Sequence, residues 1–173
     1  KLFASAENLT MTSQRLLSPN ALAPTFEPSD IRQGQRPNGS VNADSPEYLS
    51  MAAAGFEPYQ LRITGLVERP QSISYGALRN MPQQSQITRH DCVEGWSAIG
   101  KWQGPQLGAI LSAAGLMPAA RYVVFHCADQ LEGKPFYESI DLVEAFHPQT
   151  ILAYGMNGRD LPIGHGAPLR LRV

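Results

Sequence analysis

The sequence predicts an α+β fold with a mixed β-sheet and short helices. Two observations lead to this class: short apolar or alternating runs that are typical of strands, and intervening segments with helical spacing. Length and composition agree, because 173 residues with 43% hydrophobic and 17% charged side chains suffice for one folded core. We therefore expect a single α+β unit without internal repeats.

Strands are expected wherever apolar residues alternate with polar ones or form a short run. Residues 59–63 alternate as a half-buried strand does, whereas residues 122–127 are almost continuously apolar and predict a buried strand. The Asn157-Gly158 pair fits a tight hairpin turn. Further strands are expected over residues 84–90, 137–140, 151–154 and 169–173.

The expected helices are short. Residues 107–114 form an apolar helical segment that ends at Gly115, since glycine is favoured just after a helix. Asp141 and Glu144 have the spacing of a capping box for a helix over residues 142–146. A further helical turn is expected over residues 75–80.

The N-terminal part differs in composition from the rest. Residues 18–46 carry five prolines and two glycines, which predicts irregular backbone because proline removes a donor and fixes φ. We divide the chain into an extension over residues 1–17, an irregular proline-rich arm over 18–58, and a domain over 59–173 that includes the arm. The few apolar residues of the arm leave open whether it wraps around the domain or is a disordered tail. The last strand, residues 169–173, has no turn after it, so C-terminal truncation is also expected.

Charge and hydropathy exclude several partners. A formal net charge of −1 does not supply the basic face that nucleic-acid binding needs, so no nucleic-acid partner is expected. No apolar run approaches the roughly 20 residues of a membrane span. The sequence also begins without a charged and then apolar leader, so no targeting peptide is visible.

The chemically most informative segment surrounds Cys92, one of two cysteines. Arg89 and His90 precede it, and Gly95 and Trp96 follow it. A thiolate is a soft metal ligand and a strong nucleophile, and cationic neighbours favour the ionised form of a thiol. Cys92 is therefore a candidate ligand or nucleophile, although a lone cysteine also commonly fills space in a core.

Three motifs, in order along the chain, carry a resemblance to a known family. They are R-H-D-C-V-E-G-W-S with G-K-W-Q-G (residues 89–97 and 100–104), D-L-V-E-A-F-H-P-Q-T-I-L-A-Y (141–154), and N-G-R-D-L-P with H-G-A-P-L-R (157–162 and 165–170). With these motifs the chain resembles the sulfite-oxidase family of molybdopterin oxidoreductases, and within it the bacterial branch that includes periplasmic methionine-sulfoxide reductase catalytic subunits. The resemblance implies the molybdopterin-domain fold of that family and a Mo-molybdopterin cofactor.

The resemblance also implies residue roles. In that family one protein thiolate binds molybdenum beside the pterin dithiolene, and Cys92 falls on that position. Arg170 matches an arginine that holds the pterin or its phosphate, for which a planar guanidinium is suited. Four more residues are assigned to cofactor binding, namely Asn20 in the arm, His90, Cys127 and His165.

The implied activity is a two-electron reaction coupled to the transfer of an oxygen atom, on a small-molecule sulfur or nitrogen oxide or oxyanion. Relatives are mostly exported to the bacterial periplasm after cofactor insertion and often pass electrons to a heme or cytochrome partner at the membrane. The resemblance therefore implies a periplasmic location and a heme partner. The substrate and the direction of reaction stay open.

Two alternatives remain from the residues alone. His90, Cys92, His126 and Cys127 supply the nitrogens and sulfurs of a structural zinc site, although their spacing is unfavourable. A Cys92–Cys127 disulfide would instead indicate a non-catalytic structural or binding domain in an oxidising compartment. Cys127 also lies in an apolar run, where filling the core is its simplest role.

Overall fold

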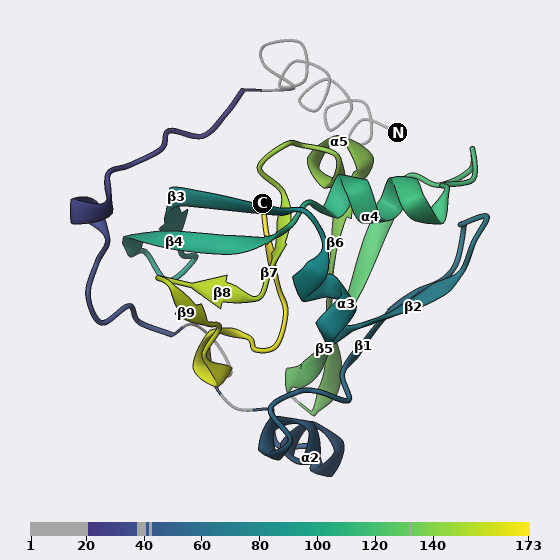
Figure 1. The fold of residues 1–173 in the computed structure, drawn as a ribbon, viewed down its shortest axis with the longest axis horizontal. Coiled ribbons are helices and arrows are strands. Elements are labelled where there is room, and N and C mark those ends of the chain that lie inside the picture. The colour runs from purple at the N-terminus through teal and green to yellow at the C-terminus, as the bar shows by residue number, and fades with distance from the viewer. Residues whose placement is uncertain (1–20, 38–40, 42, 132) are drawn as a thin grey trace, which may run out of the picture.

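The computed structural model describes residues 21–37, 41, 43–131 and 133–173, in which short helices pack around small sheets (Figure 1). The helices are the 3-10 helices η1 (Pro28–Asp30) and η2 (Ile163–His165) and the α-helices α2 (Pro46–Ala53), α3 (Tyr75–Asn80), α4 (Leu107–Ala114) and α5 (Leu142–Ala145). The strands are β1 (Gln60–Ile63), β2 (Gln71–Ser74), β3 (Gln83–Asp91), β4 (Ser97–Pro105), β5 (Tyr122–Leu131), β6 (Lys134–Asp141), β7 (Ile151–Ala153), β8 (Gly155–Met156), β9 (Arg159–Asp160) and β10 (Arg170–Arg172). None of the described helices is long and apolar enough to cross a membrane.

The strands form four small sheets, and every strand pair in the described residues is antiparallel. The largest sheet has the order β3-β4-β8-β9, and the others pair β1 with β2, β5 with β6, and β7 with β10. The α+β class is therefore confirmed. The strands do not form one mixed sheet, however, because most paired strands follow each other directly and parallel pairing would need a crossover connection.

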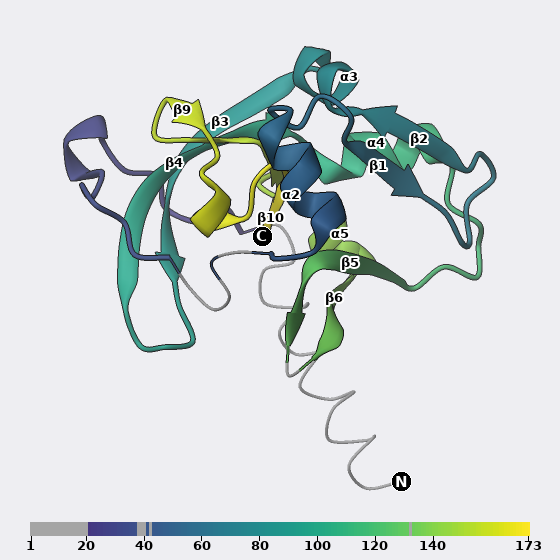
Figure 2. The same ribbon diagram turned by 90° about the horizontal axis from the view of Figure 1, so that it is seen from below.

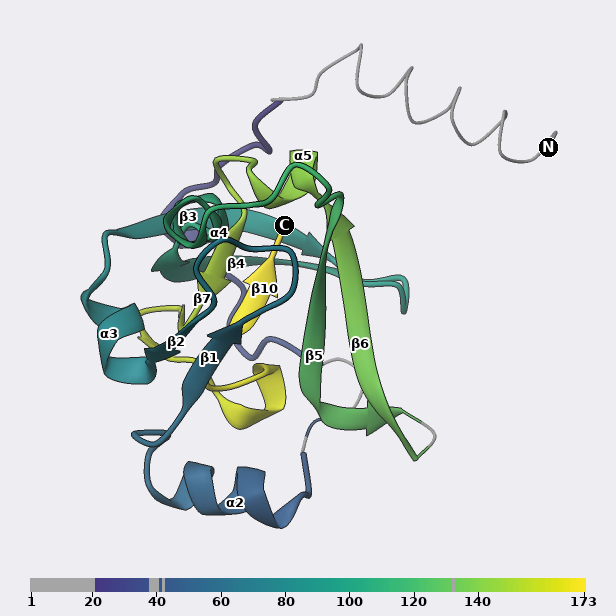
Figure 3. The same ribbon diagram turned by 90° about the vertical axis from the view of Figure 1, so that its right-hand side faces the viewer.

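Two long hairpins dominate the shape. Both hairpins project from the body of the molecule, but they run in different directions, as Figures 1 and 3 show. The C-terminal end of the described chain lies between these hairpins (Figures 2 and 3).

One face of the β3–β4 hairpin is polar and mostly buried. The register pairs Gln86 with Trp102, and alternate residues of a strand point to the same face. Trp102 is 1% exposed and packs against residues of β7 and β8. This face comprises Gln86, Thr88 and His90 of β3 with Ala98, Gly100 and Trp102 of β4.

Local sequence signals predicted several elements correctly. The structure confirms helices α3, α4 and α5 and strands β1, β3, β7 and β10 close to their expected bounds. The prediction that residues 122–127 form a buried strand was wrong on burial, because Tyr122 and Val124 are 66% and 50% exposed. β5 pairs with β6, and Tyr137 of β6 is 64% exposed as well, so one face of this ribbon is open to solvent.

The arm lies along the β3–β4 hairpin in its described part. Phe26 donates a backbone hydrogen bond to Ile87 of β3, and Arg32 donates one to Ile99 of β4, each at 3.0 Å. Residues 46–53, which were expected to be irregular, form α2 instead. Ser45 caps this helix by accepting from the N–H of Tyr48, and proline is tolerated in the first turn of a helix.

Candidate functional site

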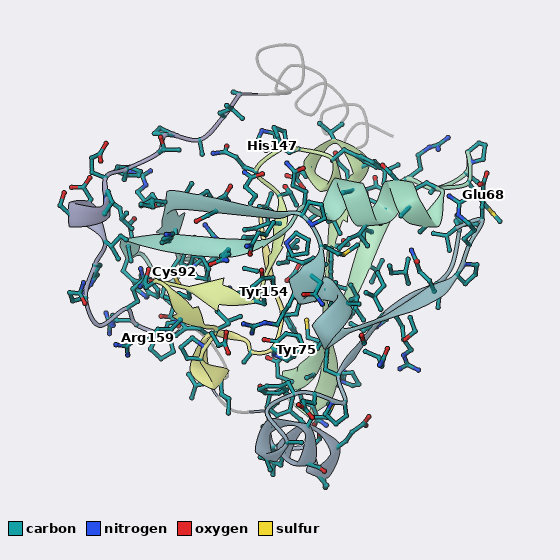
Figure 4. All side chains as sticks on the ribbon, in the orientation of Figure 1. Glu68, Tyr75, Cys92, His147, Tyr154 and Arg159 are labelled. Carbon is teal, nitrogen blue, oxygen red and sulfur yellow. The ribbon has the colours of Figure 1, made fainter. Side chains whose placement is uncertain are left out.

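Cys92 lies in the loop that joins β3 to β4, and Figure 4 labels it near the end of this hairpin. Its N–H donates to the carbonyl of Trp96, and the N–H of Gly95 donates back to the carbonyl of Cys92, each at 2.9 Å. Gly95 has a φ of 84°, a left-handed conformation that glycine adopts without steric cost. These contacts hold the loop in a tight turn and thereby fix the position of the thiol.

The loop encloses its sulfur and exposes an apolar side chain. Cys92 is 9% exposed, whereas the next residue, Val93, is 99% exposed. The backbone N–H of Glu94 donates to Sγ of Cys92 at 3.4 Å. A shielded sulfur beside a backbone N–H is held in place, as a soft ligand atom needs to be.

Two arginines of β10 lie over the indole ring of Trp102. The guanidinium carbons of Arg170 and Arg172 are 5.4 and 4.7 Å from the centroid of this ring. Burial lowers the pKa of both arginines, to about 10 for Arg172, where the charge of Arg170 adds repulsion. The nearby sulfur of Cys92 opposes the shift at Arg170. The site therefore concentrates positive charge beside Cys92.

His90 lies against these arginines. Its Nδ1 is 2.9 Å from Nη1 of Arg172, and its ring packs edge-on against Trp96 and Trp102. Burial first, and then the charges of Arg172 and Arg170, lower the pKa of His90 to about 4. His90 is therefore neutral at neutral pH.

His165 joins the same group from η2. Arg170 donates to the backbone carbonyl of His165 at 3.1 Å. Burial and the charge of Arg170 lower the pKa of the His165 ring. The structure thus brings together four residues that the sequence singled out, His90, Cys92, His165 and Arg170.

Cys127 lies in a different environment. It is exposed and sits where β5 shifts register against β6, between His126 and Gln130. Burial, and then the charges of Asp129 and Glu138, raise the pKa of its thiol. The expectation that Cys127 fills the core was wrong, and its assignment to the cofactor stays a prediction. Asn20 lies outside the described residues.

Arg172 and Trp102 were not assigned a role from the sequence. The alternation in P-L-R-L-R-V places Arg170 and Arg172 on one face, but it does not reveal whether that face is inside or outside. Trp102 belongs to the G-K-W-Q-G motif, which carries the resemblance without assigning this residue a role. The structure makes both part of the site, because Trp102 is the surface against which both guanidiniums lie.

The described side chains form neither the disulfide nor the zinc site of the two alternative interpretations. Both cysteines are free thiols, so no Cys92–Cys127 disulfide supports a scaffold domain. Residues 21–37, 41, 43–131 and 133–173 contain no group of three or more His, Cys, Asp or Glu side chains that could hold a metal ion. His90, Cys92, His126 and Cys127 therefore do not come together as one group of ligands in the described part of the chain.

A small α+β domain with one enclosed thiol beside buried cations defines a candidate cofactor-binding domain. The family described as the oxidoreductase molybdopterin binding domain matches residues 49–173, and the chain belongs to this family. The resemblance inferred from the three motifs is therefore confirmed.

Relatives and a solved structure agree with this assignment. The chain is 40% identical over 158 residues to the putative protein-methionine-sulfoxide reductase subunit YedZ1 of Azospira oryzae, an alignment that covers 91% of this chain and 56% of the relative. It is 38% identical over 127 residues to the protein-methionine-sulfoxide reductase catalytic subunit MsrP of Xanthomonas campestris pv. campestris, covering 67% of this chain and 39% of that protein. The chain thus spans only about half the length, or less, of these curated relatives.

The fold is similar to that of the sulfane dehydrogenase SoxCD from Paracoccus pantotrophus. The TM-score is 0.61 at 24% sequence identity, and the match covers 68% of this chain and 34% of that chain. At this identity the likeness shows the fold alone.

The family implies Mo-molybdopterin as cofactor, and the side chains present fit this group. Thr88 Oγ1, His90 Nε2, Trp102 Nε1 and Arg172 Nε are buried without a hydrogen-bond partner among the described residues. Nor does Arg170 or Arg172 form an ion pair with any carboxylate that the structure describes. Buried donors and cations without acceptors are costly unless a ligand supplies the acceptors. An anionic group with many acceptor atoms, next to a soft thiolate, meets this demand.

Proposed function

We propose that the chain is the cofactor-binding domain of a molybdenum-molybdopterin oxidoreductase. Its reaction would move an oxygen atom, with two electrons, to or from a small sulfur or nitrogen oxide or oxyanion. The observation that carries the proposal is the enclosed thiol of Cys92 beside the buried Arg172 and the half-buried Arg170, neither of which forms an ion pair with a described carboxylate. The cofactor, when bound, supplies the two-electron chemistry, whereas the protein supplies a ligand, orientation and a shielded pocket.

The residues have distinct roles in this proposal. Cys92 is the metal ligand, because a single thiolate is the soft donor that the site offers. Arg170 holds an anionic part of the cofactor, and its hydrogen bond to the His165 carbonyl fixes the direction of its guanidinium. His90 and His165 line the cofactor site. Cys127 and Asn20 remain proposed cofactor contacts on the strength of the family resemblance.

A sulfoxide is the substrate that we favour. Both curated relatives are named as protein-methionine-sulfoxide reductase subunits. The exposed Val93 at the tip of the cysteine loop gives an apolar contact for a thioether side chain. The substrate screen therefore starts with free and peptide-bound methionine sulfoxide and then turns to sulfite and N-oxides.

Location and electron partner follow from the same resemblance. We propose a periplasmic protein that is exported after cofactor insertion and exchanges electrons with a heme partner at the membrane. Fractionation of cells that express the natural polypeptide tests the location. Spectroscopy of membrane heme during sulfoxide turnover tests the partner, and heme that keeps its oxidation state throughout turnover would exclude it.

The decisive experiment is metal analysis of protein purified from a host that makes molybdopterin. We expect close to one molybdenum and no stoichiometric zinc per chain, and we expect Cys92→Ser to lose molybdenum while keeping its circular dichroism spectrum. Cys127→Ser, which removes the other thiol, is expected to keep the metal. A folded Cys92→Ser protein with full molybdenum would overturn the proposal.

A further inference from the structure

We propose that Arg172 is a second anion-binding residue of the Cys92 site, acting beside Arg170, and that it also positions His90 as a hydrogen-bond donor. The identity of the ligand rests on the proposed function, whereas the geometric argument for Arg172 is independent of it. The ligand group that Arg172 recognises is a tetrahedral oxyanion. It comes either from the phosphate of the cofactor or from a free oxyanion.

The first support is the placement of the Arg172 side chain. Arg172 is 7% exposed, and its guanidinium lies 4.7 Å from the Trp102 centroid, closer than that of Arg170. Two cations on one ring repel each other, and their cation–π attraction to the ring is only a modest compensation. That attraction does not offset the burial of Arg172 beside a second, half-buried cation, so a stable arrangement calls for an anion.

The second support is the set of unused donors. Nη1 of Arg172 contacts His90, whereas Nε is buried and has no partner among the described residues. An arginine has donors only, so its free N–H must find an acceptor on a ligand or stay unsatisfied. Planar N–H groups of this kind match the spacing of phosphate and sulfate oxygens.

The third support is access from a neighbouring pocket. A pocket of about 230 Å³ lies between the arm, β3 and the segment after α5, and Arg172 forms part of its wall. Thr88, with an unpartnered buried hydroxyl, and the buried Gln149 line the same pocket. Arg172 therefore stands between this pocket and His90, where a ligand group can reach it.

The contact with His90 fixes a tautomer. Because Arg172 only donates, Nδ1 of His90 must accept in this contact, which leaves Nε2 as the ring nitrogen that can donate. That Nε2 atom is buried without a partner in the part of the chain that the structure describes. The rings of Trp96 and Trp102, 5.7 and 6.4 Å away, restrict rotation of the imidazole. Arg172 thus leaves Nε2 of His90 as a hydrogen-bond donor whose acceptor would be an atom of the ligand.

The test uses four proteins purified from a host that makes molybdopterin: wild type, Arg172→Met, Arg172→Lys and Arg62→Met. Arg62 is an exposed residue of β1 and serves as the matched control. We expect wild type and Arg62→Met to carry equal pterin per folded chain, measured by fluorescence after oxidative release. The pterin content of Arg172→Met should fall to about one-tenth of the wild-type value or less. Arg172→Lys should give an intermediate content, since lysine keeps the charge but not the planar set of N–H donors. Equal pterin in Arg172→Met and Arg62→Met would overturn the cofactor role.

Titration calorimetry with sulfate distinguishes the sources of the anion. Cofactor-loaded wild type that binds sulfate at least about tenfold more tightly than Arg172→Lys indicates a free oxyanion as ligand. Sulfate binding seen only in cofactor-free wild type, with the same dependence on Arg172, indicates the cofactor phosphate. Wild-type protein that carries no pterin would overturn the proposed function. The sulfate titration of that protein would still show whether Arg172 binds an anion. Sulfate binding that is equal in wild type and Arg172→Lys, or absent from wild type in both forms, overturns anion binding by Arg172.

Nitrogen NMR tests the positioning of His90 independently of the cofactor. In wild type, the Nδ1 resonance of His90, assigned with His90→Gln, is expected to be that of an unprotonated nitrogen, and this preference should be lost in Arg172→Met. A wild-type His90 with its proton on Nδ1 would overturn the positioning role, whether or not any variant folds poorly.

Discussion

The N–H of Cys92 donates to the carbonyl of Trp96 at 2.9 Å, and the ring of Trp96 packs against His90. The Nε1 atom of Trp96 donates to Glu94 at 3.0 Å, so the loop also closes through its side chains. Residues 92–96 therefore form a self-contained turn that places the thiol.

Gly95→Ala should disturb the thiol through the backbone of the turn. Gly95 has a φ of 84°, which costs a residue with a Cβ atom about 1–2 kcal/mol. We expect a lower free energy of unfolding and less molybdenum per chain, because relief of the strain moves Cys92. Urea denaturation and metal analysis measure the two effects.

Gly65→Ala is the matched control for this strain. Gly65 has a φ of 90° in the β1–β2 connection, and an added Cβ would meet nothing within 4 Å. We expect a similar loss of stability with full molybdenum content. Equal loss of metal in both variants would mean that overall stability, not the geometry of the cysteine turn, governs cofactor retention.

Gly104→Ala should destabilise the whole fold. A Cβ atom on Gly104 of β4 would overlap the carbonyl of Leu152 on β7, and a backbone atom cannot move aside as a flexible side chain can. Such overpacking costs about 1–3 kcal/mol or more. We expect a lower urea midpoint with an unchanged slope.

Gly76→Ala in α3 is the opposite case, because its Cβ would enter open space. Alanine in a helix is favoured over glycine by about 0.5–1 kcal/mol, so stability should rise slightly. A Gly104→Ala protein as stable as Gly76→Ala would contradict the close approach of β4 and β7.

The same close approach explains why β4 was not predicted. Its buried face carries Gly100 and Gly104, and the strand ends at Pro105, all of which locally disfavour a strand. By contrast, local signals were sufficient at Asp141, which accepts from the N–H of Glu144 at 2.9 Å as the capping spacing indicated. β4 was therefore missed because a tertiary contact, rather than local strand propensity, determines its residue types.

The site was predictable in part for a related reason. The family motifs marked His90, Cys92, His165 and Arg170, and the structure brings these residues together. The role of Arg172 was missed because strand alternation shows which residues share a face but not which face is buried. Only the packing of β10 onto β7 and Trp102 decides that question.

Trp102 should contribute both burial and a π face to the site. Trp102→Leu removes the ring against which Arg170 and Arg172 lie, whereas Trp102→Phe keeps a smaller one. Replacement of a buried aromatic residue by alanine costs about 3–5 kcal/mol, which is an upper bound for these smaller changes. We expect both substitutions to lower the free energy of unfolding. The value for Trp102→Leu should be about 1–2 kcal/mol below the value for Trp102→Phe. Equal denaturation curves for the two variants would show that the arginines do not depend on an aromatic surface.

Although Cys127 is exposed, its thiol should react with an alkylating agent more slowly than an ordinary thiol does at the same pH. Burial, Asp129 and Glu138 raise the pKa of this thiol above its usual value of 9.0, so less thiolate is present at any given pH. We expect alkylation by iodoacetamide, followed at Cys127 by peptide mass spectrometry, to lag behind glutathione at pH 8 and to increase with pH beyond 9. Glu138→Gln removes one of the charges responsible and should shift the rate profile to lower pH. A wild-type profile that matches glutathione, or one that Glu138→Gln leaves in place, would mean that neighbouring carboxylates do not control this thiol.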